Sequence, residues 1–250
     1  MSEALASSSF PASLGGMLVL RQHGQVFQDA QTLLPAAALI GPSAEASHFR
    51  QQGRLAAVGL LLEPQAVMLI SAMPNRYTRG QALPLRDLLP PGSLTDLSEE
   101  LAQAPSDRLR CELLFRWLRQ LIAGRSRAAA RVLAAGELSA LLGQGLDEAL
   151  RGLRISARQL ERRSLELLGM SPKRAQAVLR MQAALSQALC EPEARSGAAL
   201  ALNHGYYDQS HMARDMRGLA GAPIRRLLNP SSAAQDSYWS LRLAPQLARA

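Results

Sequence analysis

Asp208-Gln209-Ser210-His211-Met212-Ala213-Arg214 repeats, 52 residues later, the pattern of Ser156-Ala157-Arg158-Gln159-Leu160-Glu161-Arg162. Each stretch begins with a residue suited to a helix N-cap, Ser156 or Asp208. Each continues to a glycine suited to a left-handed C-cap, Gly169 or Gly221. The pattern predicts two short capped helices, 157–168 and 209–220. Two short basic helices of this kind are what a protein needs to enter two successive major grooves of DNA.

A helical wheel divides each of these helices into a packing face and an outward face. The packing faces hold Leu160, Ser164 and Leu167 in the first helix and Met212, Met216 and Leu219 in the second. The outward faces hold Arg158, Arg162 and Leu165 in the first helix and Ser210, Arg214 and Arg217 in the second. We therefore expect each helix to pack on one side and to present arginine on the other.

A second short helix is predicted before each capped helix, at 146–153 and at 198–204. Gly205 suits the positive φ that the tight turn before the second capped helix requires. Helix, tight turn and capped basic helix together form a helix-turn-helix arrangement. Pro172, after Ser171, starts a long helix predicted to reach Leu189 and to join the two units. The alternative is a pair of helical hairpins whose arginines are merely solvated.

Charge is concentrated in the half of the chain that contains the repeat. Residues 1–125 carry 11 basic and 10 acidic residues, and residues 126–250 carry 17 basic and 10 acidic residues, of a total net charge of +8. All the basic residues except Lys173 are arginine, whose planar guanidinium binds phosphate and guanine through two hydrogen bonds. A genome rich in GC would enrich arginine by default, so the positions of the arginines carry the argument.

The N-terminal half has a different character, and residues 1–14 are predicted to be flexible. Short apolar runs bounded by Gly and Pro predict strands at 18–20, 38–40 and 55–62, whereas 66–70 fits a strand or a short helix. Ser106 is a suitable N-cap for a helix reaching Ala123, and shorter helices are expected at 128–135 and 137–142. The predicted fold class is α+β, a β-rich N-terminal domain followed by an all-α domain of two helix-turn-helix units joined by a long helix.

The predicted domain ranges follow from these patterns. They are a β-rich sensor or dimerisation domain at 15–100, a helical linker region at 105–144, a double helix-turn-helix DNA-binding domain at 145–230, and a C-terminal tail at 231–250. Phe27, Phe49, Met68 and Met73 could line an apolar pocket in the first of these, although ordinary core packing is the simpler role.

Several classes of function find no support in the residues. Cys111 and Cys190 are expected to be reduced core residues of a cytoplasmic protein, and the four histidines have no metal-ligand spacing. No Ser-His-Asp, Cys-His or paired-carboxylate spacing stands out, so neither catalysis nor a cofactor is expected. No apolar run is long enough to span a membrane, and no signal peptide is evident.

Residues 146–228 resemble the DNA-binding domain of AraC/XylS-type transcriptional regulators. In the second unit, the resemblance rests on Gly205 to His211 with Arg214, Asp215, Leu219, Gly221 and Pro223. In the first unit, it rests on Ser156 to Arg163 with Gly169, Ser171, Pro172 and Lys173. Residues 17–125 are similar, more weakly, to a β-rich domain found on some members. The resemblance implies a sequence-specific regulator of transcription whose helices 157–168 and 209–220 read adjacent major grooves about 34 Å apart.

The resemblance also implies the residues and partners of the site. Positions that match base-contacting residues of the family are Arg158, Glu161, Arg162, Ser210, His211 and Arg214; Gln209 belongs to the same surface, and Arg163 and Arg217 are expected to meet phosphates. Double-stranded DNA is the main expected partner. A small-molecule effector, RNA polymerase and a second copy of the chain are further expected partners.

Three residues depart from the family pattern, and other functions stay open. Ser164 and Met216 occupy positions that usually hold phenylalanine, and Arg154 stands where the first turn usually has glycine. These differences would suit a helical protein-interaction module that has lost specific DNA binding. A second alternative is an N-terminal enzyme or small-molecule carrier with a DNA-binding appendage.

Overall fold

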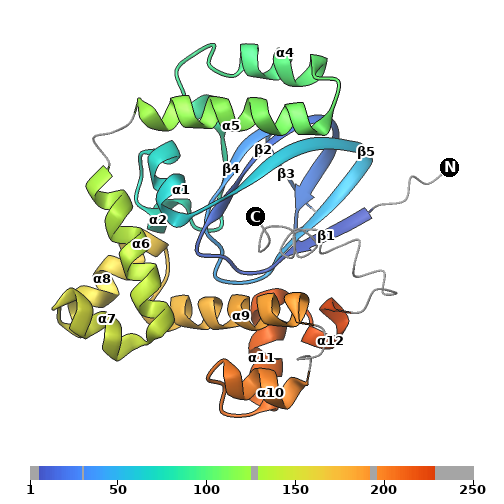
Figure 1. The fold of residues 1–250 in the computed structure, drawn as a ribbon. Coiled ribbons are helices and arrows are strands. Elements are labelled where there is room, and N and C mark those ends of the chain that lie inside the picture. The colour runs from blue at the N-terminus through green and yellow to red at the C-terminus, as the bar shows by residue number, and fades with distance from the viewer. Residues whose placement is uncertain (1–5, 30, 125–128, 192–195, 229–250) are drawn as a thin grey trace.

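The structure, a computed structural model, describes residues 6–29, 31–124, 129–191 and 196–228. An antiparallel sheet formed by the N-terminal part of the chain is followed by helices (Figure 1). The predicted α+β class is therefore confirmed. The predicted tail at 231–250 lies outside the described residues. None of the described helices is long and apolar enough to cross a membrane.

The sheet is built around two long neighbouring strands. The strands are β1 (Ala6–Phe10), β2 (Gly16–Gln28), β3 (Thr32–Leu33), β4 (Ala37–Ile40), β5 (Ser47–Leu62) and β6 (Ala82–Pro84). Their order is β1-β5-β2-β4-β6, and β3 pairs with β2. The prediction that residues 1–14 are flexible is wrong for β1, because Ser8 pairs with Phe49 in the antiparallel ladder with β5.

Alternating side chains of the sheet serve two faces. Leu18 and Leu20 of β2 enter a core with Leu60 of β5 and with helices α1 (Pro64–Ser71), α4 (Thr95–Gln103) and α5 (Asp107–Ala123). The Ser106 Oγ accepts a hydrogen bond from the Leu109 amide, as predicted for the N-cap of α5. The segment 66–70, which fitted a strand or a helix, lies in α1. Two short helices, α2 (Asn75–Thr78) and α3 (Leu85–Leu88), complete this part of the chain.

The remaining helices carry the predicted repeat. They are α6 (Ala129–Gln144), α7 (Leu146–Leu153), α8 (Ala157–Leu168), α9 (Pro172–Cys190), α10 (Gly197–Asn203), α11 (Gln209–Ala220) and α12 (Ile224–Leu227). The bounds predicted for α8 and α11 are confirmed. A single helix, α6, stands where two shorter helices were expected, because the chain continues through Gly136 without a break.

The core of the helical part also contains side chains from the N-terminal part. Ala12, Leu14 and Met68 belong to the same buried cluster as Leu160 of α8 and Met212 of α11. The two parts thus share a core, and the domain ranges stay a prediction.

The expectation of buried cysteines is wrong. Cys111 on α5 and Cys190 at the end of α9 are both free and exposed. Each lies on the outward side of a helix that packs through other positions.

Candidate nucleic-acid interface

Side-chain caps define the first turns of α8 and α11. The Ser156 Oγ accepts a hydrogen bond from the Gln159 amide at 3.3 Å, and the Gln159 Oε1 accepts one from the Ser156 amide at 2.9 Å. Asp208 accepts a hydrogen bond from the His211 amide at 2.6 Å. Each cap satisfies an amide at the helix N-terminus that has no partner within the helix.

Glycines in the left-handed conformation end both helices. Gly169 has φ 75° and Gly221 has φ 77°, which glycine adopts without a steric penalty. The N-caps and C-caps together explain why two segments far apart in the sequence form helices of the same length.

The packing faces predicted by the helical wheel are confirmed. All six packing positions of α8 and α11 are buried: Leu160, Ser164, Leu167, Met212, Met216 and Leu219. Ser164 is fully buried, and its Oγ donates a hydrogen bond of 2.7 Å to the Met170 carbonyl. The serine that departs from the family pattern is thus paired, and it joins α8 to the segment that enters α9.

The two turns use the same backbone conformation with different residues. Gly205 has φ 68° in the second turn, and Arg154 has φ 50° at the end of α7 in the first. A side chain in this region is strained relative to glycine, by about 1–2 kcal/mol. The first unit therefore forms the turn with Arg154 at an energetic cost that the second unit avoids.

The outward arginines are accessible. Arg158 and Arg162 of α8 and Arg214 and Arg217 of α11 are all exposed. Within the part of the chain that the structure describes, none of the four forms an ion pair with a carboxylate. Glu161 and Ser210 are exposed beside them. The arrangement provides positive charge and hydrogen-bond donors for an anionic surface.

Three of the predicted site residues also lie against other residues of the chain. A Cβ on Gly197 would lie 2.6 Å from the Gln209 Nε2, so the exposed Gln209 side chain lies against α10. Arg163 lines a hollow with Glu137 and Glu166. His211 is half-buried beside the Tyr206 ring, with ring centroids 5.4 Å apart.

A partly buried polar cluster that the sequence patterns did not reveal holds α9 against α11. The Arg180 guanidinium lies 4.5 Å from the centre of the Tyr206 ring, and its Nη2 lies 3.2 Å from the Asp215 Oδ2. His211 Nε2 lies 3.8 Å from the same carboxylate oxygen. Burial raises the pKa of Tyr206 to about 12, and Asp215 adds to this rise. His211 therefore has a neighbour in this cluster as well as a place on the outward surface.

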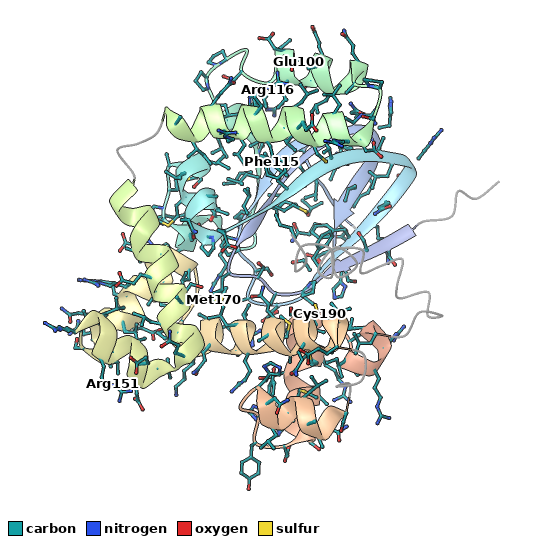
Figure 2. The ribbon with its side chains drawn as sticks, viewed as in Figure 1. Glu100, Phe115, Arg116, Arg151, Met170 and Cys190 are labelled. Carbon is teal, nitrogen blue, oxygen red and sulfur yellow. The ribbon has the colours of Figure 1, made fainter. Side chains whose placement is uncertain are left out.

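Helix α9 lies between the two helix-turn-helix units. Figures 1 and 2 show the first unit beside Met170, before α9, and the second unit near Cys190, at the other end. The 19 residues of α9 extend for roughly 28 Å at the usual helical rise. This length is comparable with the spacing of about 34 Å between adjacent major grooves on one side of a duplex.

A cavity lies on the face of the sheet that does not pack against α5. Its volume is about 420 Å³, and its walls include Met17 and Val19 of β2, Ile40 and Phe49. Of the four residues considered for an apolar pocket, Phe49 lines this cavity; Phe27, Met68 and Met73 do not. Arg21 also lines it, and its Nη2 donates a hydrogen bond of 2.7 Å to the Leu34 carbonyl.

Among the residues that the structure describes, no acid neutralises the charge of Arg21. Burial lowers the pKa of Arg21, and among the described residues no carboxylate lies within ion-pair distance of it. A second cavity, of about 240 Å³, shares Phe10, Met17 and Phe49 with the first and extends to Leu185 of α9. The sheet cavity thus shares wall residues with a second cavity, and that second cavity is lined in part by the helix that joins the two units.

The described residues offer no site for a metal ion. No group of three or more His, Cys, Asp or Glu side chains lies among them in positions that could hold one.

Comparisons with known proteins agree with this geometry. The family described as helix-turn-helix domain matches residues 150–229. No curated protein matches the chain significantly. The structure of wild-type ToxT from Vibrio cholerae bound to an unsaturated fatty acid superposes with a TM-score of 0.51 at 10% identity, covering 90% of this chain and 91% of ToxT. The apo structure of a single-residue variant of ToxT from the same organism has a TM-score of 0.48 at 11% identity, covering 89% and 93%.

The superposition with fatty-acid-bound ToxT supports the same overall arrangement of a β-rich N-terminal part and a helical C-terminal part. The helix-turn-helix match at residues 150–229 supports DNA binding in the regulation of transcription. Residues 150–229 therefore match a helix-turn-helix domain of the AraC type, which is the resemblance that the sequence indicated.

Proposed function

We propose that this chain is a sequence-specific transcriptional regulator that reads two adjacent major grooves with α8 and α11. The single observation that carries the proposal is the pair of equivalent helices, each buried on one side and exposing arginines on the other that have no carboxylate partner among the described residues. Arg158, Arg162 and Arg214 are the proposed base-reading arginines, because arginine bonded to guanine is the commonest specific contact in the major groove.

The remaining residues of the proposed surface have supporting roles. Glu161 and Ser210 lie beside the arginines and can accept or donate hydrogen bonds at base edges. Arg217 would contact phosphate, as would Arg163 if its side chain leaves the hollow it shares with Glu137. Gln209 and His211 would mainly orient α11, since each also contacts other residues of the second unit.

The DNA proposal is tested by selecting duplexes from a random-sequence pool and measuring affinity for the selected duplex and for an unrelated one. Arg214→Ala should weaken binding to the selected duplex by about 1–3 kcal/mol and relax its preference at one base pair. Arg86→Ala, which removes an exposed arginine outside the helical units, is the matched control for charge. Equal loss on both duplexes would instead make Arg214 a phosphate contact.

Salt dependence separates DNA reading from protein interaction. Phosphate contacts release counterions, so the affinity for DNA should fall steeply as salt increases, with a slope set by the number of contacts. A chain that selects no duplex, and whose weak DNA binding is unaffected by the arginine substitutions, would favour a protein-interaction module.

We further propose that the sheet cavity binds an effector with an apolar body and one carboxylate. Its volume of about 420 Å³ falls within the range of roughly 300–1,000 Å³ that ligand cavities occupy. Its walls are mostly apolar, and Arg21 supplies a cation without a carboxylate partner among the described residues. The unsaturated fatty acid bound to ToxT has this chemistry, an apolar chain that ends in a carboxylate.

Oleic acid and oleyl alcohol provide a direct test, since they share an apolar chain and differ in the carboxylate. Oleic acid should raise the melting temperature of the chain more than oleyl alcohol does, because only the acid can pair with Arg21. Arg21→Met should abolish the difference, whereas the control Arg54→Met, at an exposed position of β5, should preserve it. Equal effects of the two compounds on the unsubstituted chain would refute the role of Arg21.

A further inference from the structure

The N-terminal part of the chain donates a hydrogen bond to the equivalent backbone carbonyl of each helix of the repeat. The Asn75 Nδ2 donates to the Leu167 carbonyl of α8 at 2.7 Å. The Ala12 amide donates to the Leu219 carbonyl of α11 at 2.6 Å. Leu167 and Leu219 are 52 residues apart, which is the spacing of the repeat itself.

Both acceptors are carbonyls that the helices cannot satisfy themselves. The last four carbonyls of an α-helix have no partner within that helix, and buried ones need a donor from elsewhere. Leu167 and Leu219 each lie one residue before the end of their helix, at Leu168 and Ala220. The Ala46 amide also lies 3.4 Å from the Gly218 carbonyl in the same turn of α11.

The orientation of the Asn75 amide is determined by its neighbours. Asn75 is fully buried, and its Nδ2 faces two carbonyls, that of Leu167 and that of Pro64 at 2.9 Å. The Thr78 Oγ1 lies 3.2 Å from the Asn75 backbone carbonyl and 3.3 Å from the Asn75 Oδ1, so its one proton is shared between these two acceptors, whereas the nitrogen faces only acceptors. Only a neutral amide in this orientation satisfies all these groups.

The backbone of Asn75 also lies close to the C-cap of α8. A Cβ on Gly169 would lie 2.9 Å from the Asn75 carbonyl oxygen, so a larger residue would push α2 and α8 apart. On the other side, the Ala12 carbonyl lies 3.5 Å from the Gln182 Nε2 of α9. Arg174, in the first turn of α9, donates to the Ala44 carbonyl at 2.7 Å. The N-terminal part therefore contacts α8, α9 and α11.

We propose that Asn75 and the Ala12 amide are positioning groups that hold α8 and α11 in one relative arrangement, and that they thereby set the spacing between the two DNA half-sites. The second clause rests on the proposed DNA-reading function; the first does not. The covalent connection between the two helices runs through α9 and α10 and the segments that join them. Two further attachments, to α2 and to the segment between β1 and β2, remove freedom that this connection would otherwise allow.

The positioning role is tested without DNA, by pulsed EPR on the full chain. Cys111 and Cys190 are replaced by Ser, and nitroxide labels are attached to Arg162→Cys and Arg214→Cys, which are exposed and equivalent in the repeat. The doubly labelled chain with Asn75 intact, the parent, should give one narrow distribution of distances between the two labels. Asn75→Asp, which removes the donor and sets a carboxylate against two carbonyls, should lose that single population.

Two additional variants keep the test decisive. Asn75→Ala removes the donor without adding charge and gives the same readout if Asn75→Asp does not fold. Asn203→Asp makes the identical chemical change at an exposed position of α10 and should retain the parent distribution. Unchanged distances in a folded Asn75 variant would overturn the proposal, as would equal broadening in the Asn203 control.

The effect of Asn75 on the spacing between DNA half-sites is tested separately. Duplexes selected by the Asn75 variants should tolerate more than one spacing between half-sites, whereas those selected by the parent should share one. Changed EPR distances with no selected duplex would leave the positioning role intact and refute the DNA-reading function. Changed distances with an unchanged spacing requirement would show that α9 alone sets the spacing.

Discussion

Replacing Ser164 by alanine tests the packing of the first unit most directly. The Ser164 hydroxyl is fully buried and donates to the Met170 carbonyl at 2.7 Å, and Met170 is only 1% exposed. The substitution leaves that carbonyl buried without its donor. Leaving such a group unsatisfied destabilises a folded protein by about 1–3 kcal/mol. For a chain of this length, each kcal/mol lowers the melting temperature by roughly 2–4 °C, so a decrease of about 2–12 °C is expected.

Thermal and urea unfolding followed by circular dichroism would measure this change. Ser98→Ala, the same substitution at an exposed position of α4, is the matched control and should leave the midpoint nearly unchanged. Identical midpoints for Ser164→Ala and Ser98→Ala would refute the argument that the hydroxyl stabilises the turn between α8 and α9. Ser164→Phe restores the residue usual in the family, but it should also destabilise, because it overfills a site that already contains the Met170 hydrogen bond.

Three further outcomes are expected. Met216→Ala, at the equivalent position of α11, should lower the free energy of unfolding by about 2–5 kcal/mol in urea titrations, because it leaves a cavity. Tyr206 should ionise near pH 12 in an ultraviolet titration; since an unfolded tyrosine ionises at about 10, the free energy of unfolding should decrease from about pH 10 to 12, and Tyr206→Phe should reduce that decrease. Cys111 and Cys190 should both react with a maleimide in the native state, giving two adducts by mass spectrometry.

Local signals in the sequence were sufficient for the two capped helices. Ser156, Asp208, Gly169 and Gly221 act within one helical turn of their own position, so their effect does not depend on the rest of the fold. The three- and four-residue spacing of apolar side chains likewise determined which face of each helix is buried. These features explain why the bounds of α8 and α11 and their outward residues could be predicted.

Signals that depend on packing were harder to interpret. Gly136 lies in the gap between the helices expected at 128–135 and 137–142, yet α6 continues through it, since one glycine inside a helix costs only about 1 kcal/mol. The exposure of Cys111 depends on which side of α5 faces the sheet. The N-terminal residues looked flexible because β1 is short and rich in serine, and its stability comes from pairing with β5.

The sequence by itself determined α8 and α11, their caps and the arginines they present, since all of these follow from neighbours within a few residues. Only the tertiary structure decided what holds these helices relative to one another. Asn75 and Leu167 are 92 residues apart, and the Arg180–Asp215 pair also joins separate helices. No local pattern encodes such pairs, because a buried donor is matched to its acceptor only when packing of the whole chain brings them together.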